Sequence, residues 1–157
     1  LNNLRKYLLN TNKSLVVCCK SYGFRLEAEK YFYKKFFENI NITISINAEN
    51  ISDDNYFNSY KNLIKSEVIL GLPSTLLREA FFYKKKILCF DCSNLDNHPF
   101  RSISLCNKSD YQSFDRKLNL LFKTNYEDYL KELNYSNNYV IGKMDTINKI
   151  KSFLKTN

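Results

Sequence analysis

With 157 residues, the chain has the length of one domain and can bury one hydrophobic core. A hydrophobic content of 44% excludes a disordered chain, and no window approaches the roughly 18 apolar residues that a membrane-spanning helix needs. A net charge of +8 would suit a polyanion, but the lysines are scattered, and only 84–86 form a run, at a predicted helix end. We therefore expect no nucleic-acid partner.

The beginning of the sequence indicates a piece of a larger protein. The first residue is Leu1, and the opening LNNLRKYLLN has neither the apolar core nor the cleavage site of a secretory signal. We interpret residues 1–157 as a single domain, a fragment of a longer chain.

Apolar runs and helical patterns alternate along the sequence. Interior strands are predicted from continuous apolar runs such as LVVCC, and helices from apolar residues at helical spacing. In chain order, we expect a strand at 15–19, a helix at 25–39, a strand at 42–46, a helix at 56–65 capped by Asp53, Asp54 or Asn55, a strand at 67–71, a helix at 75–83 and a strand at 86–91.

The pattern weakens after residue 91. A polar loop at 92–99 precedes a short edge strand at 101–105, and three helices follow at 109–122, begun by Ser109 or Asp110, at 126–133 and at 143–154. Buried strands that alternate with helices predict a parallel sheet covered on both faces. The expected fold class is therefore a doubly wound, Rossmann-like α/β sheet with a helical C-terminus.

The cysteines allow two interpretations. Four of the five lie in or just after strand-like runs, which indicates small buried apolar residues in a reducing cytosol. The alternative is a zinc site, because Cys89 and Cys92 are two residues apart, with His98 and Cys106 beyond. Cys89 lies inside a strand pattern and no second close pair exists, so we expect no metal.

The expected site lies at the carboxyl ends of the strands, where ligands of open parallel sheets bind. After the third strand, Ser74 and Thr75 place two hydroxyls at a helix start, where unpaired N–H groups and the helix dipole favour an anion. Gly71 and Pro73 shape this turn. The hydroxyls could bind a phosphate, cap the helix, or do both.

Further candidates flank this turn. Glu79 lies one helical turn after Thr75, where its carboxylate could accept hydrogen bonds from a ribose or simply face solvent. Lys20 and Ser21 follow the first strand, where the lysine could face a phosphate or end the strand at the surface. His98, the only histidine, precedes Pro99 in a loop, and no spacing nominates a catalytic base.

The segment SEVILGLPSTLLREAFFYKKKILCFD, residues 66–91, resembles the nucleotide-sugar-binding half of GT-B glycosyltransferases, and more narrowly those that build bacterial capsule and lipopolysaccharide. Lys20 followed by RLEAEKYFYKKFF, and NSYKNLIKSEV before the motif, support the resemblance, which covers residues 15–101 well and the C-terminal helices loosely.

The resemblance implies transfer of a sugar from a nucleotide donor to a glycan or lipid-linked acceptor, without a metal or another cofactor. In related sialyl- and Kdo-type transferases a Ser-Ser/Thr pair binds the donor phosphate of a CMP-sugar, and Ser74-Thr75 matches that pair. The Glu of the same motif corresponds to Glu79, near the ribose. Those enzymes carry a His-Pro upstream of the pair, whereas here His98-Pro99 lies downstream and Lys20-Ser21 hold the upstream position. UDP-, GDP- and CDP-sugars therefore stay open as donors.

A GT-B enzyme has a second, N-terminal domain that binds the acceptor and supplies the base, and this resemblance implies that the fragment binds donor but transfers no sugar alone. It also implies a cytoplasmic location, including the inner face of the cytoplasmic membrane. Two other classes stay open: a non-catalytic α/β nucleotide-binding or regulatory module, and a basic nucleic-acid-binding domain, which would need lysines and aromatic residues gathered on one face.

Overall fold

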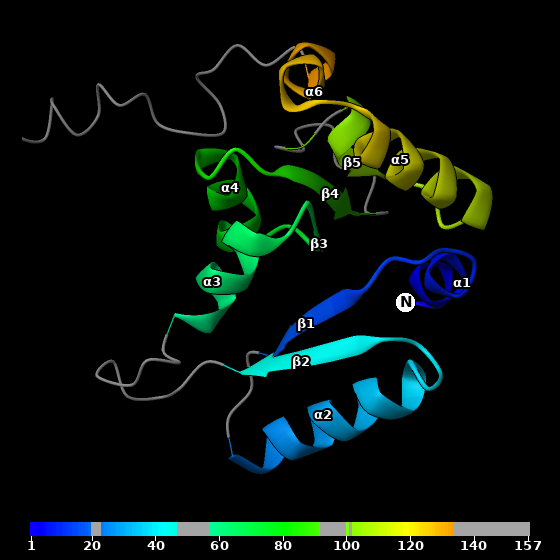
Figure 1. Cartoon of the computed structure of the whole chain (residues 1–157), viewed down its shortest axis with the longest axis vertical. Coiled ribbons are helices and arrows are strands. Elements are labelled where there is room, and N and C mark those ends of the chain that lie inside the picture. The colour runs from blue at the N-terminus through cyan, green and yellow to red at the C-terminus, as the bar shows by residue number, and fades with distance from the viewer. Residues whose placement is uncertain (20–22, 47–56, 92–99, 101, 134–157) are drawn as a thin grey trace, which may run out of the picture. The chain divides into compact units, whose positions relative to one another are not determined.

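The computed structural model describes residues 1–19, 23–46, 57–91, 100 and 102–133. The chain divides into two compact units, Leu1–Ser66 and Glu67–Asn157. Strands alternate with helices in both units, and the strand pairs of the described residues are parallel (Figure 1). The expected α/β class is confirmed in this form, as two small parallel sheets. That residues 1–157 form one domain stays a prediction.

The first unit contains a two-stranded parallel sheet. β1 (Leu15–Cys19) pairs with β2 (Ile42–Ile46), and both strands have the bounds that the sequence predicts. The helices in the described part of this unit are α1 (Asn2–Leu9), α2 (Gly23–Phe36) and α3 (Asn58–Lys65). The chain passes from β1 through α2 to β2; α2 contacts β1, and α3 contacts both strands (Figure 1).

Three features of the first unit differ from the sequence predictions. Among the described residues β1 pairs with β2 alone, and its Val16 and Cys18 are exposed, so an interior strand is not confirmed. The helix α1 was not predicted, although it buries Tyr7 and Leu8. α3 begins at Asn58, later than the predicted start at 56, and its N-cap Phe57 forms no side-chain capping bond; the proposed caps at 53–55 lie outside the described residues.

The second unit contains a three-stranded parallel sheet in the order β3-β4-β5. Its strands are β3 (Val68–Gly71), β4 (Lys86–Phe90) and the short β5 (Leu105–Cys106). A 3-10 turn, η1 (Ser102–Ser104), leads into β5, so only the end of the predicted 101–105 strand is extended. The helices are α4 (Thr75–Phe82), α5 (Tyr111–Lys123) and α6 (Tyr126–Leu133). The predicted helix at 143–154 lies outside the described residues.

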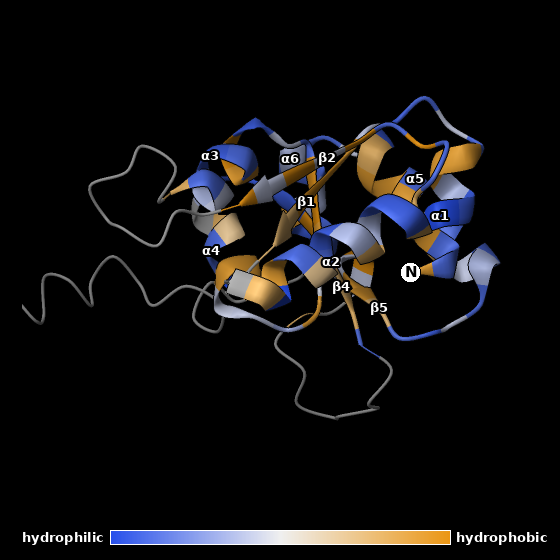
Figure 2. Cartoon of the chain, turned by 90° about the horizontal axis from the view of Figure 1, so that it is seen from below, coloured by the Kyte–Doolittle hydropathy of each residue, from blue (hydrophilic) through white to orange (hydrophobic). Residues whose placement is uncertain are grey.

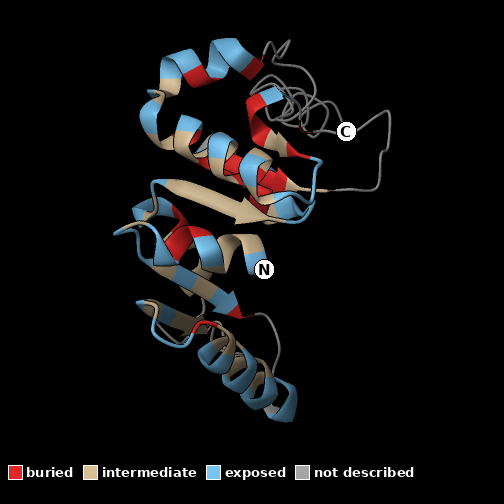
Figure 3. Cartoon of the chain, turned by 90° about the vertical axis from the view of Figure 1, so that its right-hand side faces the viewer, coloured by how far each residue is buried: buried red, intermediate tan, exposed pale blue. Residues whose placement is uncertain are grey.

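The core of the second unit forms around β4, the middle strand. Hydrophobic residues dominate this strand (Figure 2), and the buried residues of the unit gather on it and on the helices that cover it (Figure 3). The ring of Phe81 stacks on those of Phe100 and Tyr129, with both centroid distances at 6.2 Å. The buried hydrophobic residues of this unit are Leu77, Ala80, Phe81, Ile87, Leu88, Cys89, Phe100, Ile103, Cys106, Phe114, Leu118, Leu121, Tyr129 and Leu133.

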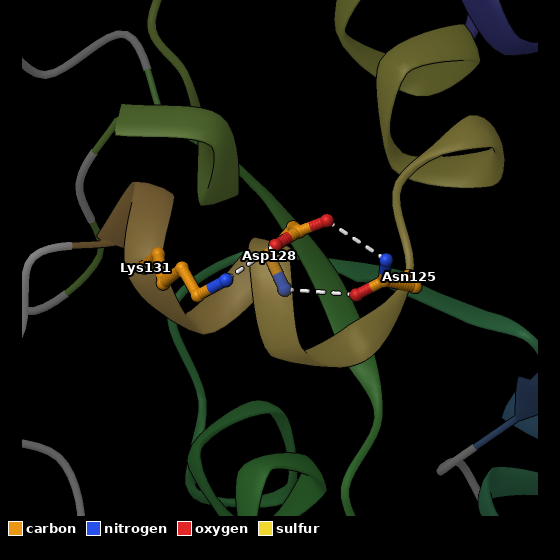
Figure 4. A network of polar contacts seen from close by, with 3 residues as sticks. All are labelled: Asn125, Asp128 and Lys131. Atoms are coloured by element: carbon orange, nitrogen blue, oxygen red, sulfur yellow. Dashed lines mark hydrogen bonds and ion pairs between the residues drawn. The ribbon is translucent and has the colours of Figure 1, made fainter.

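Polar side chains begin each of the helices described in the second unit. Ser74 caps α4, as expected, and Asp110 caps α5, where the sequence allowed either Ser109 or Asp110. At the start of α6, Asn125 and Asp128 bond reciprocally (Figure 4): Asn125 Oδ1 accepts from the Asp128 backbone N–H at 2.9 Å, and Asn125 Nδ2 donates to Asp128 Oδ2 at 2.8 Å. Lys131 Nζ lies 2.8 Å from the other Asp128 oxygen.

Candidate functional site

The candidate site is the turn between β3 and α4, at the carboxyl edge of the three-stranded sheet. β3 ends at Gly71 and α4 begins at Thr75, so residues 72–74 take the chain from strand to helix. Ser74 has an extended backbone, with φ −150° and ψ 162°. Its Oγ accepts a hydrogen bond from the Leu77 N–H at 3.2 Å, and its carbonyl accepts one from the Arg78 N–H at 3.2 Å. The turn thus sets Ser74 as a regular helix cap.

This cap is compatible with a bound anion. The Ser74 hydroxyl accepts from Leu77 and still has its own hydrogen to donate. An α-helix leaves its first N–H groups without intrahelical partners, and the dipole is positive at that end. The capping role expected for Ser74 is present, and phosphate binding by the same hydroxyl stays a prediction.

Solvent reaches the tip of this turn. Leu72, Pro73, Ser74 and Thr75 are all exposed, and Leu72 retains 68% of its surface. Glu79 lies one turn further along α4 and is half-buried. The structure therefore places Ser74, Thr75, Pro73 and Glu79 on one short segment, with both hydroxyl-bearing residues accessible to a ligand.

Gly71 ends β3 opposite Cys89 of β4. A Cβ added at this position would lie 3.8 and 3.9 Å from the two δ-carbons of Leu77, which is ordinary van der Waals contact. Packing within the chain therefore leaves room for a Cβ at this position. That Gly71 allows a ligand to approach the backbone closely stays a prediction.

The lysine run lies at the other end of α4. Lys84 directly follows the C-cap Tyr83, and Lys86 begins β4. The Lys86 ammonium donates to the Thr124 carbonyl at 2.9 Å and lies 3.7 Å from a carboxylate oxygen of Glu67. These contacts belong to the amino edge of the sheet, which fits the expected role of the run at a helix end.

Other predicted site residues lie outside the described part of the chain. Lys20 and Ser21 belong to the gap at 20–22, and His98-Pro99 to the gap at 92–99. Their roles stay predictions.

The described cysteines are all free thiols. Cys19, Cys89 and Cys106 are buried as expected, whereas Cys18 is exposed, because β1 turns this side chain away from the buried Cys19 side of the strand. Among described residues no group of three or more His, Cys, Asp and Glu side chains could hold a metal ion. Cys92 lies outside that part of the chain.

A second feature of the same sheet edge was not predicted. Behind the end of β5, a small open pocket of about 50 Å³ is lined by Cys106, Asn107, Lys108, Ser113, Arg116 and Lys117. The positions 108, 116 and 117 look like scattered surface charges in the sequence. They meet because the loop at 107–110 folds the start of α5 back against β5.

No protein-family model matches the sequence, and neither the curated proteins nor the solved structures give a significant match. In the described residues, no helix is long and apolar enough to cross a membrane.

Proposed function

We propose that this chain is the donor-nucleotide-binding part of a GT-B glycosyltransferase that acts in surface-polysaccharide or lipopolysaccharide synthesis. The observation that carries the proposal is the β3–α4 turn, where Ser74 caps a helix at the carboxyl edge of a parallel sheet and Thr75 is exposed beside it. The sequence resemblance of residues 66–91 supports the same assignment. A Rossmann-like domain formed by both units is part of this proposal.

The proposed donor is a nucleotide-sugar, with a CMP-sugar of the Kdo or sialic acid type favoured over UDP-, GDP- and CDP-sugars. Its phosphate would take hydrogen bonds from the Ser74 and Thr75 hydroxyls and from the first N–H groups of α4. Lys20 and Ser21 are proposed as further phosphate contacts, and Glu79 as an acceptor for ribose hydroxyls. Gly71 and Pro73 would keep the turn open.

The proposed catalytic contribution is electrostatic. Fixed donors around the nucleotide phosphate would stabilise the negative charge that develops as the bond to the sugar breaks. The general base and the acceptor site, for a glycan or a lipid-linked acceptor, would come from an N-terminal domain outside these 157 residues. The full protein would work in the cytoplasm, including the inner face of the cytoplasmic membrane.

Calorimetric titration with CMP, CDP, UDP and GDP tests the donor site. Two Ser74 variants separate capping from ligand binding. Ser74→Ala removes the cap and the proposed phosphate contact together. Ser74→Asp keeps an N-cap acceptor and adds a negative charge that repels phosphate. We expect both variants to lose nucleotide affinity, and only Ser74→Ala to lose stability.

Asn125→Ala is the matched control for these variants. It removes the side-chain cap of α6. This cap follows Thr124, which bonds Lys86 at the start of β4, so it lies at the amino edge of the sheet, whereas the Ser74 turn lies at the carboxyl edge. Its nucleotide affinity should equal that of the wild type. Unchanged affinity in Ser74→Asp would show that the site is assigned wrongly.

The alternative, a non-catalytic nucleotide-binding or regulatory module, predicts the same titration but a different outcome with substrates. If the proposal is right, the full-length protein transfers sugar from the nucleotide that binds best, and the 157-residue chain does not. Hydrolysis or transfer by this chain alone would contradict the assignment of the base to another domain.

A further inference from the structure

The pocket behind β5 gathers positive charge around a small volume. Lys108, Arg116 and Lys117 contribute three cations, and Asn107 and Ser113 contribute polar groups. At about 50 Å³ the pocket is far smaller than the roughly 300 Å³ of a typical small-molecule site. It can hold one small charged group, and it cannot hold a nucleoside.

Two carboxylates beside this pocket already accept hydrogen bonds from groups of α5. Asp110 caps α5, its Oδ1 accepting from the Ser113 N–H at 2.8 Å. Asp115 accepts from the Tyr111 hydroxyl at 3.3 Å and from the Asn119 side-chain amide at 3.1 Å. Within the described residues, no ion pair joins Lys108, Arg116 or Lys117 to a carboxylate. The three positive charges therefore outnumber the two nearby negative charges of Asp110 and Asp115.

Lys117 is the most enclosed of the three cations. Its ammonium donates to the Ser102 carbonyl at 2.7 Å, which fixes it beside η1. Burial lowers the pKa of this ammonium, and the neighbouring Arg116 lowers it further, whereas the Cys106 thiol acts in the opposite direction. A half-buried cation beside another cation is stabilised by an anion that enters the same pocket.

From this arrangement we infer that the pocket between β5 and α5 is a binding site for a phosphate-sized oxyanion, held by Lys108, Arg116 and Lys117. Arg116 would bind two oxygens through its guanidinium group, and the Lys108 and Lys117 ammonium groups would supply charge. Ser113 also lines the pocket, and its side chain hydrogen-bonds the Asp110 carboxylate at the start of α5.

The oxyanion could be inorganic phosphate or a phosphate group of a larger ligand. β3, β4 and β5 are parallel neighbours, so the Ser74 turn and this pocket follow strands that are two strand spacings apart, about 10 Å, at one sheet edge. The inference does not rest on the proposed nucleotide site, because it uses different residues.

Titration of the 157-residue chain with inorganic phosphate, followed by amide chemical shifts at constant ionic strength, tests this inference. We expect saturable shifts that are largest at residues 106–117. Arg116→Gln and Lys108→Gln should each lower the phosphate affinity about fivefold, the size expected for the loss of one solvent-exposed charge interaction. Both residues are exposed, so these variants should fold.

Lys123→Gln is the matched control, since it removes the same charge from the last turn of the same helix. Its phosphate affinity should stay within twofold of the wild-type value. Shifts that do not saturate, or equal weakening by Lys123→Gln and Arg116→Gln, would show a diffuse charge effect and overturn the inference.

Two further arms identify the source of the phosphate and keep the two proposals apart. If Ser74→Asp still binds phosphate, the phosphate binds in this pocket. The nucleotide proposal is then decided by the nucleotide titration alone. If CMP displaces phosphate from the wild type and Arg116→Gln weakens CMP as well, the phosphate group belongs to the nucleotide. Phosphate binding abolished by Ser74→Asp and kept by Arg116→Gln would overturn the inference.

Discussion

The Tyr129 hydroxyl accepts a hydrogen bond from the backbone N–H of Ile87 at 3.1 Å, although 42 residues separate the two in the sequence. Ile87 belongs to the middle strand β4, whose neighbour β5 begins only opposite Cys89. Among the described residues no strand pairs with Ile87 on that side, and a side chain from α6 bonds its N–H instead. The same hydroxyl lies 2.7 Å from Ser104 Oγ, in the residue just before β5.

Tyr129→Phe should destabilise the protein by about 1–3 kcal/mol, because it leaves the buried Ile87 N–H and the buried Ser104 hydroxyl without this partner. The ring itself stays, so stacking on Phe81 is kept. Urea unfolding measures the change in the free energy of unfolding.

Tyr126→Phe is the control for this change. Its hydroxyl makes a longer bond of 3.3 Å to the Phe81 carbonyl in a partly buried place, so its loss should cost less. Equal costs for the two variants would show that the link between Tyr129 and Ile87 does not complete the sheet.

Local patterns predicted much of the fold. β1 and β2 have the predicted bounds because short β-favouring runs end in polar residues on both sides. The start of α4 was predicted at Ser74 and that of α5 at Ser109 or Asp110, since a capping side chain needs only the backbone three residues ahead.

Features that depend on distant contacts were not predicted. β5 is only two residues long because η1 and Tyr129 take the place of further strand pairing, and no local pattern contains that information. Likewise Lys108 and Arg116 meet only after α5 folds against β5, so the sequence did not indicate their pocket. For α1 a local signal existed, since Leu4, Tyr7 and Leu8 have helical spacing, but polar neighbours obscure it.

Lys84→Gly should stabilise the protein by about 0.5–1 kcal/mol. Lys84 has a φ of 53°, a left-handed conformation that suits glycine better than a residue with a Cβ. The Lys84 N–H donates to the Phe81 carbonyl at 3.0 Å and the Lys85 N–H to the Ala80 carbonyl at 2.9 Å, as in a Schellman motif. Lys85→Gly removes the same charge at a position without a positive φ and should destabilise. A thermal melt of both variants checks the opposite signs.

The cap of α5 should make stability fall in acid. The hydrogen bond from the Ser113 N–H holds the pKa of the Asp110 carboxyl below its ordinary value. A carboxyl whose pKa is lower in the folded state contributes fully above its unfolded pKa of about 3.9, and the contribution is lost as pH falls through the folded value. Asp110→Asn keeps a capping oxygen that does not titrate. The stability advantage of the wild type over Asp110→Asn should therefore shrink below about pH 4 in urea unfolding; a constant difference would contradict it.

Thiol reactivity should separate Cys18 from the buried cysteines. Burial, aided by the Asp91 carboxylate, raises the pKa of the Cys89 thiol to about 12, so almost no thiolate forms near neutral pH. Cys19 and Cys106 are shielded from reagent by burial. Partial burial also raises the pKa of the Cys18 thiol, but its side chain is exposed. The accessibility of each thiol to the reagent therefore sets the order in which the cysteines react.

In a Cys92→Ser background, native iodoacetamide labelling read by mass spectrometry should modify Cys18 first, and Cys18→Ser should abolish the fast phase. Fast modification of Cys89 in the native protein would show that β4 is not the closed core strand described above, because a reagent can reach that thiol only when the strand is uncovered.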